Sequence, residues 1–388
     1  MRRRSIATTL GALALGAMLA ATFYQPLAQY IPFTPEVLGQ QNGQQSGQPE
    51  APAGAAAPSD PCAPVIASLP SRRQLAQLIQ VGVKPEDSQD ALAVVNAEQV
   101  GGIFIGGDAP GLLTGGALAL VRAASKVPIT VSVDDEGGRV QRIDNLDGSI
   151  PSARQMAATM SPEQVRELAK KRGGELQSRG VTMDLAPVVD TSAQADNTVI
   201  GDRSFSADPA VARKYAEAFA AGLRDAGVEP VLKHFPGHGN ANGDSHLGVA
   251  ATPPLDVLRG RDLVPYQNIA SYGEVAVMVG HLDVPGLTEG KPATLSPAAY
   301  ALLRKDYAFN GLVMTDDLGA MKAVTDVADL PEAVRIALAS GADVALWSTG
   351  GRVGEVLDRL EQALKDGGLA PERVSEALHR VLKSKGLC

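Results

Sequence analysis

Short apolar runs alternate with amphipathic stretches along most of the chain, beginning near Ser71. Each run is rich in Val, Ile and Leu and is nearly continuous, as expected of parallel strands that are buried on both faces. Eight such runs are found, at 78–83, 101–107, 129–136, 182–190, 230–235, 275–283, 311–317 and 343–348.

Helices are predicted between these runs. A Ser-Pro-Glu start predicts a helix from Ser161 to near Gly180, and an Asp-Pro start predicts another from Asp208 to Gly227. Eight strand–helix units favour an α/β fold in which a single domain forms a closed (β/α)8, TIM-like barrel. The sequence lacks both the GxGxxG turn of a dinucleotide-binding fold and the GxxxxGK[ST] phosphate loop, which argues against an open doubly wound sheet.

The N-terminal part of the sequence has a different composition. Arg2, Arg3 and Arg4 precede an uncharged run that reaches about Tyr24, so residues 1–30 are predicted to be a signal peptide or an uncleaved membrane anchor. Residues 31–61 are rich in Gln, Gly, Ala and Pro and are predicted to be a flexible, disordered linker. The barrel is then expected over 62–388, in a protein exported to the outer face of the cytoplasmic membrane, to the cell wall or to the medium.

The net charge and the two cysteines bear on the possible partners and on the covalent structure. The net charge of -8 argues against nucleic-acid binding, which usually needs a concentrated basic surface. The two cysteines, Cys62 and Cys388, bracket the predicted domain. In an oxidising compartment they are expected to form one disulfide that joins the two ends of the domain. The alternative is a pair of unrelated thiols.

Polar residues recur where the apolar runs end, which in a (β/α)8 barrel is the end that carries reactive groups. A single strand-end carboxylate is most often a helix cap, but five sets at one end of a barrel predict a functional site. These sets are Asp134, Asp135 and Glu136; Asp190; Lys233 and His234; His281 and Asp283; and Asp316 and Asp317.

The segment KHFPGHGNANGDSH (233–246) holds three of the five His residues and has three interpretations. His234 and His238, with Asp244 and His246, have ligand types that suit zinc, but Pro236 and Gly237 break the helix that would bring the first two together. Loop carbonyls can instead satisfy His238 in a structural role. The favoured interpretation is acid–base catalysis, in which the Asp244 carboxylate orients and charges the His246 imidazole.

Asp316 directly follows a fully apolar run in VMTDDLGAM, so its carboxylate is expected in the barrel mouth. A carboxylate facing a proton donor is the arrangement that retaining glycoside cleavage uses, and Asp316 is the candidate nucleophile. Asp317 could equally cap the following helix. Trp347 is either a platform for a sugar ring or part of the core.

Five motifs together resemble one known family. They occur in the order and spacing of the family 3 glycoside hydrolases that act as bacterial β-N-acetylhexosaminidases on peptidoglycan fragments. The motifs are DDEGGRVQRI (134–143), APVVD (186–190), GDRSF (201–205), KHFPGHG with DSH (233–246) and TDDLGAM (315–321).

The resemblance implies a role for each matching residue. Asp316 would be the nucleophile, and Asp244 with His246 the acid–base dyad of a mobile loop. The residues implied in sugar binding are Asp134, Arg142, Arg203, Lys233 and His234. Without the resemblance, Arg203 beside Asp202 would be taken as a surface ion pair and Arg139 as a pair within the barrel.

The expected function is therefore that of a retaining exo-β-N-acetylglucosaminidase that releases terminal β-GlcNAc from peptidoglycan-derived glycosides. Neither a metal nor a cofactor is expected, and the expected partners are carbohydrates, with attachment to a membrane or cell wall through the N-terminus. Phosphorolysis of the same glycosides is an alternative because His, unlike Glu, does not repel phosphate. A β-glucosidase activity and a non-catalytic role in binding the cell wall are also open.

Overall fold

The computed structural model describes residues 60–108 and 110–388. The described residues within 60–388 form one compact unit. The predicted signal or anchor (1–30) and nearly all of the predicted linker (31–61) lie outside the described residues. In the described part of the chain, no helix has both the length and the apolarity needed to cross a membrane.

Eight parallel strands form the barrel, in the order β10-β1-β2-β3-β4-β5-β7-β9. Their bounds are β1 (Ile79–Val83), β2 (Gly102–Ile105), β3 (Thr130–Val133), β4 (Met183–Asp184), β5 (Glu229–Phe235), β7 (Ala276–Val279), β9 (Val313–Thr315) and β10 (Ala345–Trp347). The two outer strands of this order also meet, because Met314 and Val344 form a parallel bridge and the Thr315 N–H donates to the Val344 carbonyl at 3.0 Å. The (β/α)8 fold predicted from the sequence is thus confirmed.

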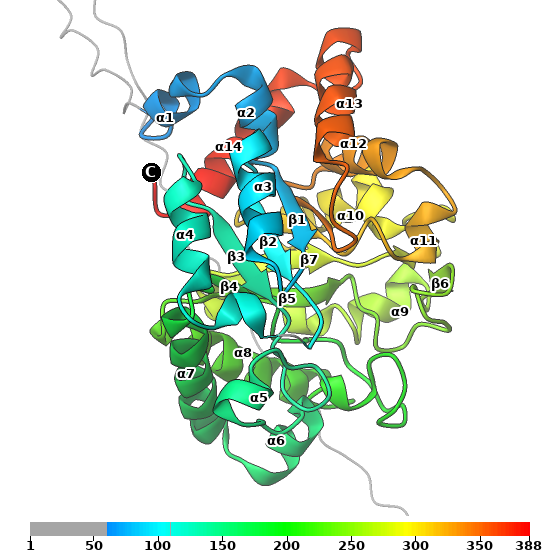
Figure 1. Ribbon diagram of the computed structural model, residues 1–388. Coiled ribbons are helices and arrows are strands. Elements are labelled where there is room, and N and C mark those ends of the chain that lie inside the picture. Colours follow the sequence, from blue (N-terminus) through cyan, green and yellow to red (C-terminus); the bar gives the residue numbers. More distant parts are fainter. Residues whose placement is uncertain (1–59, 109) are drawn as a thin grey trace, which may run out of the picture. The chain divides into compact units, whose positions relative to one another are not determined.

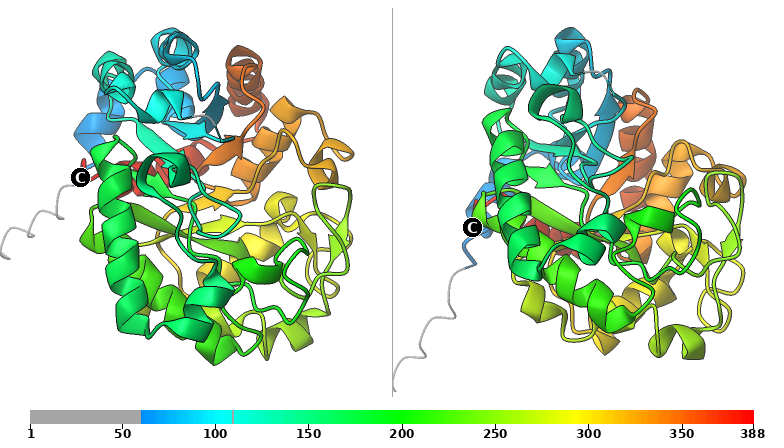
Figure 2. Two further views of the ribbon diagram at one scale, coloured as in Figure 1. Left: turned by 60° about the horizontal axis from the view of Figure 1, so that its bottom comes forward. Right: turned by 90° about the horizontal axis from the view of Figure 1, so that it is seen from below.

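Helices cover the outside of the barrel, as the two views in Figure 2 show. The longer ones, labelled in Figure 1, are α3 (Ser88–Glu98), α4 (Ala117–Ala124), α7 (Pro162–Ser178), α8 (Pro209–Asp225), α12 (Leu330–Ser340), α13 (Val353–Asp366) and α14 (Pro371–Ser384). Short helices lie at the ends and in the connections: α1 (Ala63–Ser68), α2 (Ser71–Ala76), α5 (Asp144–Asp147), α6 (Ala153–Thr159), α9 (Leu255–Arg259), α10 (Pro297–Ala301) and α11 (Lys322–Thr325).

The two helices predicted from their start signals begin where expected. Ser161 caps α7 in a reciprocal capping box, in which its side chain accepts the Gln164 N–H and the Gln164 side chain accepts the Ser161 N–H. Asp208 caps α8 by accepting the N–H groups of Ala210 and Val211. Local chemistry fixes both helix starts.

Most of the barrel strands are shorter than the predicted runs, and two runs differ most from the prediction. The run 182–190 forms only the two-residue β4 (Met183–Asp184), and beyond it an isolated parallel bridge joins Val188 to Lys233. The run 275–283 divides after Val279, and its second part, β8 (Leu282–Asp283), pairs with β6 (Ala250–Ala251) in a separate two-stranded sheet. Tertiary pairing therefore shortened runs whose apolar pattern looked continuous.

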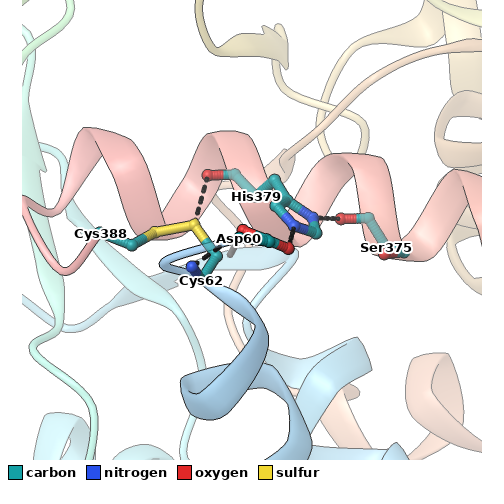
Figure 3. Close-up of a disulfide and its surroundings, with 5 residues drawn as sticks. All are labelled: Asp60, Cys62, Ser375, His379 and Cys388. Atoms are coloured by element: carbon teal, nitrogen blue, oxygen red, sulfur yellow. Dashed lines mark hydrogen bonds and ion pairs between the residues drawn. A yellow bond between two sulfur atoms is a disulfide. The ribbon is translucent and has the colours of Figure 1, made fainter. Parts of the chain in front are cut away.

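The two ends of the described unit are covalently joined. Cys62 and Cys388 form a disulfide with a Cα–Cα distance of 5.0 Å across a sequence separation of 326 residues (Figure 3). The disulfide predicted from the sequence is confirmed, and it ties the start of α1 to the segment after α14.

Candidate active site

A cavity of about 560 Å³ lies at the carboxyl ends of the barrel strands. Its lining includes side chains that follow β3, β5, β9 and β10. Seven of the eight site residues predicted from the sequence line it, namely Asp134, Arg142, Arg203, Lys233, His234, His246 and Asp316. The eighth, Asp244, is hydrogen-bonded to His246. The fold thus gathers residues that are up to 182 positions apart in the sequence, from 134 to 316.

A buried ion-pair cluster forms one wall of the cavity. The Lys233 ammonium lies 2.6 Å from Asp134 Oδ1 and 2.6 Å from Glu136 Oε1. Arg203 binds the Glu136 carboxylate with two parallel hydrogen bonds, each 2.7 Å long. Such bidentate pairing fixes the guanidinium plane as well as its charge.

The charges of this cluster determine its protonation state. Burial acts to raise the pKa of Glu136, but Arg203 and Lys233 lower it well below its usual value. Burial acts to lower the pKa of Lys233, but Asp134 and Glu136 raise it. Glu136, Lys233 and Arg203 are therefore all charged at neutral pH.

Arg142 lies at the rim of the same wall with looser contacts. Its guanidinium is 3.8 Å from Asp134 and 3.8 Å from Asp108, and Nη1 donates to the Gln141 carbonyl at 2.9 Å. The Nε atom of Arg142 is buried and has no partner among the described residues. Its guanidinium thus retains hydrogen-bonding capacity on the lining of the cavity.

His234 and His238 are both held by Asp190. The His234 Nδ1 lies 2.7 Å from Asp190 Oδ2, and the His238 N–H donates to Asp190 Oδ1 at 2.7 Å. The ring of His238 turns the other way, so that its Nε2 meets the Ser245 hydroxyl at 3.2 Å. His238 is thus satisfied within the protein, in agreement with its structural interpretation, and His234 presents its other ring edge to the cavity.

Asp316 is almost fully buried at the end of β9, and one of its oxygens accepts the Asp317 N–H at 2.9 Å. Burial acts to raise the pKa of the Asp316 carboxyl, but the neighbouring imidazoles of His281 and His234 lower it below its usual value. Asp317 instead accepts the N–H groups of Gly319 and Ser348, which ties the loop after β9 to the end of β10. Asp316 therefore presents an ionised carboxylate to the cavity, whereas the Asp317 side chain stabilises the turn.

Asp244 and His246 lie on the loop between β5 and β6. The His246 Nδ1 lies 2.7 Å from Asp244 Oδ1, which also accepts the His246 N–H at 3.0 Å. The His246 side chain is 55% exposed, and its Nε2 has no hydrogen-bond partner among the described residues. Burial acts to raise the pKa of Asp244, but its hydrogen bonds from His246 lower it. This loop therefore presents an imidazole that is oriented by an ionised carboxylate.

Glu136 and Asp190 belong to the strand-end sets noted in the sequence, but no catalytic or sugar-binding role was predicted for either. Glu136 lines the cavity and joins Lys233 to Arg203, and Asp190 orients His234. Both are strand-end carboxylates in the sequence pattern, but their partners are distant in sequence. One sequence signal could have pointed to these carboxylates. A buried Lys or Arg at another strand end requires a carboxylate as its partner.

Three further expectations are settled by the observed contacts. Arg203 pairs with Glu136 and not with the adjacent Asp202, so the surface-pair interpretation is wrong. Asp202 instead pairs with Arg139 at 2.9 Å, and because the Arg139 side chain is 41% exposed, the expected pairing of Arg139 within the barrel is also wrong. Trp347 is fully buried and its Nε1 donates to the Gly351 carbonyl, so it belongs to the core and is not a sugar platform.

The barrel and the charged cavity at its carboxyl end place the chain among the (β/α)8 enzymes, and comparison with known proteins narrows this class to glycoside hydrolases. Residues 71–384 match the model of the "Glycosyl hydrolase family 3 N terminal domain", so the chain belongs to glycosyl hydrolase family 3.

Relatives share most of the described sequence and the barrel. The chain is 52% identical over 329 residues to beta-hexosaminidase LpqI of Mycobacterium tuberculosis, which covers 83% of this chain and 84% of LpqI. A crystal structure of a family 3 member from Mycobacterium smegmatis is 54% identical, with a TM-score of 0.80 over 82% of this chain and 98% of that one. A family 3 beta-N-acetylglucosaminidase from Paenibacillus is 29% identical, with a TM-score of 0.77 over 82% of this chain and 62% of that one.

Proposed function

We propose that this protein is a retaining exo-β-N-acetylglucosaminidase that releases terminal β-GlcNAc from peptidoglycan-derived glycosides. The observation that carries the proposal is the shared cavity, which Asp316 lines from β9 and His246 lines from the loop after β5. An ionised carboxylate and an oriented imidazole on one small cavity are the two groups that double displacement needs.

Asp316 is the proposed nucleophile. Its lowered pKa keeps the carboxyl ionised at neutral pH. In the first step a carboxylate oxygen bonds to the anomeric carbon while the glycosidic C–O bond breaks, which gives a covalent glycosyl–enzyme. In the second step water attacks the same carbon and releases Asp316, so the sugar keeps its β configuration.

His246 is the proposed acid and base. Its Nε2 gives a proton to the leaving oxygen in the first step and takes a proton from the attacking water in the second. The Asp244 carboxylate, 2.7 Å from Nδ1, holds the ring and stabilises the imidazolium form. Binding of the sugar hydroxyls and the N-acetyl group is assigned to Asp134, Arg142, Arg203, Lys233 and His234.

The substrate is inferred from the relatives. Beta-hexosaminidase LpqI and the Paenibacillus beta-N-acetylglucosaminidase carry names that refer to N-acetylhexosamine glycosides. The Arg-rich, Ala-rich and Leu-rich N-terminus supports export, which would bring the enzyme to cell-wall fragments outside the cytoplasm. Attachment through the N-terminus to the membrane or wall is part of this proposal.

The test uses a chromogenic β-GlcNAc glycoside and the matching β-glucoside, with and without phosphate. We expect β-GlcNAc turnover without phosphate, and a loss of about 10³-fold or more in kcat for Asp316→Ala. His246→Ala should lose far more activity on chitobiose than on the nitrophenyl glycoside, because a good leaving group needs little protonation. A slow 5-fluoro analogue of the β-GlcNAc substrate should leave one 5-fluoro-N-acetylhexosaminyl group on the peptide that contains Asp316.

Each alternative has its own outcome in this test. Formation of GlcNAc-1-phosphate would identify a phosphorylase, and a preference for the β-glucoside would identify a β-glucosidase. If His246→Ala loses the same factor of activity on chitobiose and on the nitrophenyl glycoside, His246 is not the acid. If every substrate stays intact, the non-catalytic binding protein is the better interpretation.

A further inference from the structure

Four side chains with metal-binding atoms lie together where α1 meets α14, outside the cavity described above. They are Asp60, Cys62, His379 and Cys388, of which the two cysteines form the disulfide (Figure 3). The ligand atoms of Asp60, Cys62 and His379 all lie within 4.8 Å of one another. One small metal ion could contact all three atoms without a large movement of the backbone.

His379 is held in an orientation that suits a metal ligand. Its Nδ1 donates to the Ser375 carbonyl, one helical turn earlier on α14, at 2.7 Å. This bond points Nε2 toward the Asp60 carboxylate (Figure 3). Metal-bound histidines usually donate their second ring N–H to such a carbonyl, which fixes the ring and increases its basicity.

Asp60 is also oriented toward the cluster. Its Oδ1 accepts the Cys62 N–H at 2.9 Å, and its Oδ2 forms an ion pair with His379 Nε2. The side chains of His379 and Asp60 are 37% and 43% exposed, so an ion from solvent can reach them. In the disulfide form, the His379 proton lies where a cation would otherwise bridge the nitrogen and the carboxylate.

We propose that reduction of the Cys62–Cys388 disulfide converts this cluster into a zinc-binding site. Two thiolates, one imidazole and one carboxylate are ligand types that zinc takes in a tetrahedral site. The metal would then join the same two segments that the disulfide joins. Disulfide and metal exclude each other, because both need the same two sulfur atoms.

The chemical balance of the change is simple. A phosphine reductant gives an electron pair to the disulfide, and water supplies the oxygen of the phosphine oxide and the two thiol protons. Zinc then displaces these two protons and the Nε2 proton of His379, all of which pass to the buffer. Metal binding should therefore release protons and weaken as the pH falls.

The experiment uses the full chain, reduced with a phosphine and desalted without oxygen, with Co²⁺ as the spectroscopic probe. We expect one Co²⁺ per chain with near-ultraviolet thiolate-to-cobalt absorption, and loss of that absorption when Zn²⁺ is added. The oxidised chain should lack the band, which separates this site from any ion held by the imidazoles of the barrel mouth. His379→Gln should weaken binding to the reduced chain at least tenfold, whereas Glu372→Gln, an exposed change on the same helix, should not.

A second measurement uses thermal unfolding, because a reduced chain that is partly unfolded could also bind Co²⁺ through its thiols. Zn²⁺ should raise the Tm of the reduced chain toward that of the oxidised chain and leave the oxidised Tm unchanged. The proposal fails if the reduced chain lacks the thiolate band, or if Zn²⁺ leaves its Tm unchanged. It also fails if His379→Gln binds Co²⁺ as tightly as the wild type, since the two thiols would then act alone.

Discussion

Glu136 shows how a single residue can hold the wall of the cavity in place. It lies between Lys233 and Arg203, both of which are buried and charged. Removing one partner of a buried ion pair leaves an uncompensated charge, which costs more than the pair itself contributes. The residue therefore matters through the two cations that it neutralises.

Glu136→Gln is predicted to destabilise the protein by about 3 kcal/mol at pH 7. The pKa of Glu136 is lowered in the folded protein, so its ionised form stabilises the fold above the usual Glu pKa, and this contribution decreases as the pH falls below that value. Urea unfolding of both proteins at pH 7 and at successively lower pH should show a difference in stability that shrinks below about pH 4.5.

The surface substitution Glu355→Gln serves as the control and should show a small difference at every pH, since its pair with Arg352 is exposed and exposed pairs contribute little. A difference for Glu136→Gln that stays constant down to low pH would contradict the assignment of an ionised Glu136.

Asp184 is a second buried carboxyl near this cluster. Its pKa is shifted in the opposite direction to that of Glu136. It is fully buried in β4, its Oδ1 accepts the Asp135 N–H at 2.9 Å, and its Oδ2 has no partner among the described residues. Burial and the nearby charge of Asp135 raise the pKa of Asp184 well above its usual value. We infer that Asp184 is neutral in the folded protein.

Asp184→Asn is predicted to be more stable than the wild type at pH 7, with a Tm higher by about 2 °C or more. The folded wild type keeps a proton that the unfolded chain releases above the usual Asp pKa, so its stability falls as the pH rises. Asn has no such proton and can keep the bond to Asp135. Calorimetry should show that this advantage disappears near pH 3.8 and below, and an advantage that is independent of pH would count against a neutral Asp184.

Among the elements, helix α8 depends on Asp208, the residue that caps its N-terminus. Asp208→Ala removes the acceptor for the N–H groups of Ala210 and Val211 and should cost about 1 kcal/mol of stability. Asp208→Asn keeps an acceptor and should cost much less. Because this cap is not among the residues that line the cavity, kcat and KM on a β-GlcNAc glycoside should not change, and a loss of kcat in the Ala variant would show that α8 also positions the site.

Ser245 makes two of the contacts that hold the loop between β5 and β6. The Ser245 hydroxyl lies 3.2 Å from His238 Nε2, and the Ser245 carbonyl accepts the Ala323 N–H at the start of α11. These contacts hold the segment that carries His246 against the barrel. The position of the proposed acid therefore depends on a buried neighbour.

Ser245→Ala should lower kcat by about tenfold on a poor leaving group, which corresponds to the loss of one hydrogen bond. KM should change little, because Ser245 is not part of the cavity lining. Steady-state kinetics on chitobiose and on the nitrophenyl glycoside tests this. A rise in KM with an unchanged kcat would mean that the loop positions the sugar and not the acid.

At the scale of the whole molecule, the disulfide joins ends that are separated by 326 residues. Cys388→Ser should lower the stability by about 2–4 kcal/mol, because the unfolded chain gains conformational freedom. The active-site cavity should keep its activity at 25 °C, since neither cysteine lines it. Thermal unfolding in metal-free buffer measures the effect, and an unchanged Tm would show that packing of α1 on α14 suffices.

The pattern of apolar runs predicted all eight barrel strands, and the caps of α7 and α8 marked two helix starts to the residue. Strand lengths were less predictable, because the second part of the run 275–283 pairs with β6 in a separate sheet instead of extending β7. Of the eight candidate residues chosen from the motifs, seven line one cavity. Glu136 and Asp190 were not selected, because their importance comes from partners far away in the sequence.

The sequence by itself determined the barrel, the family and most of the candidate site, because periodicity, capping and motif spacing are local properties of the chain. Only the tertiary structure decided which charges neutralise each other. Arg203 pairs with Glu136 and not with its neighbour Asp202, and Trp347 is enclosed in the core. Burial makes these choices, since a charge or ring removed from water takes the partner that folding brings within reach, whatever its distance along the sequence.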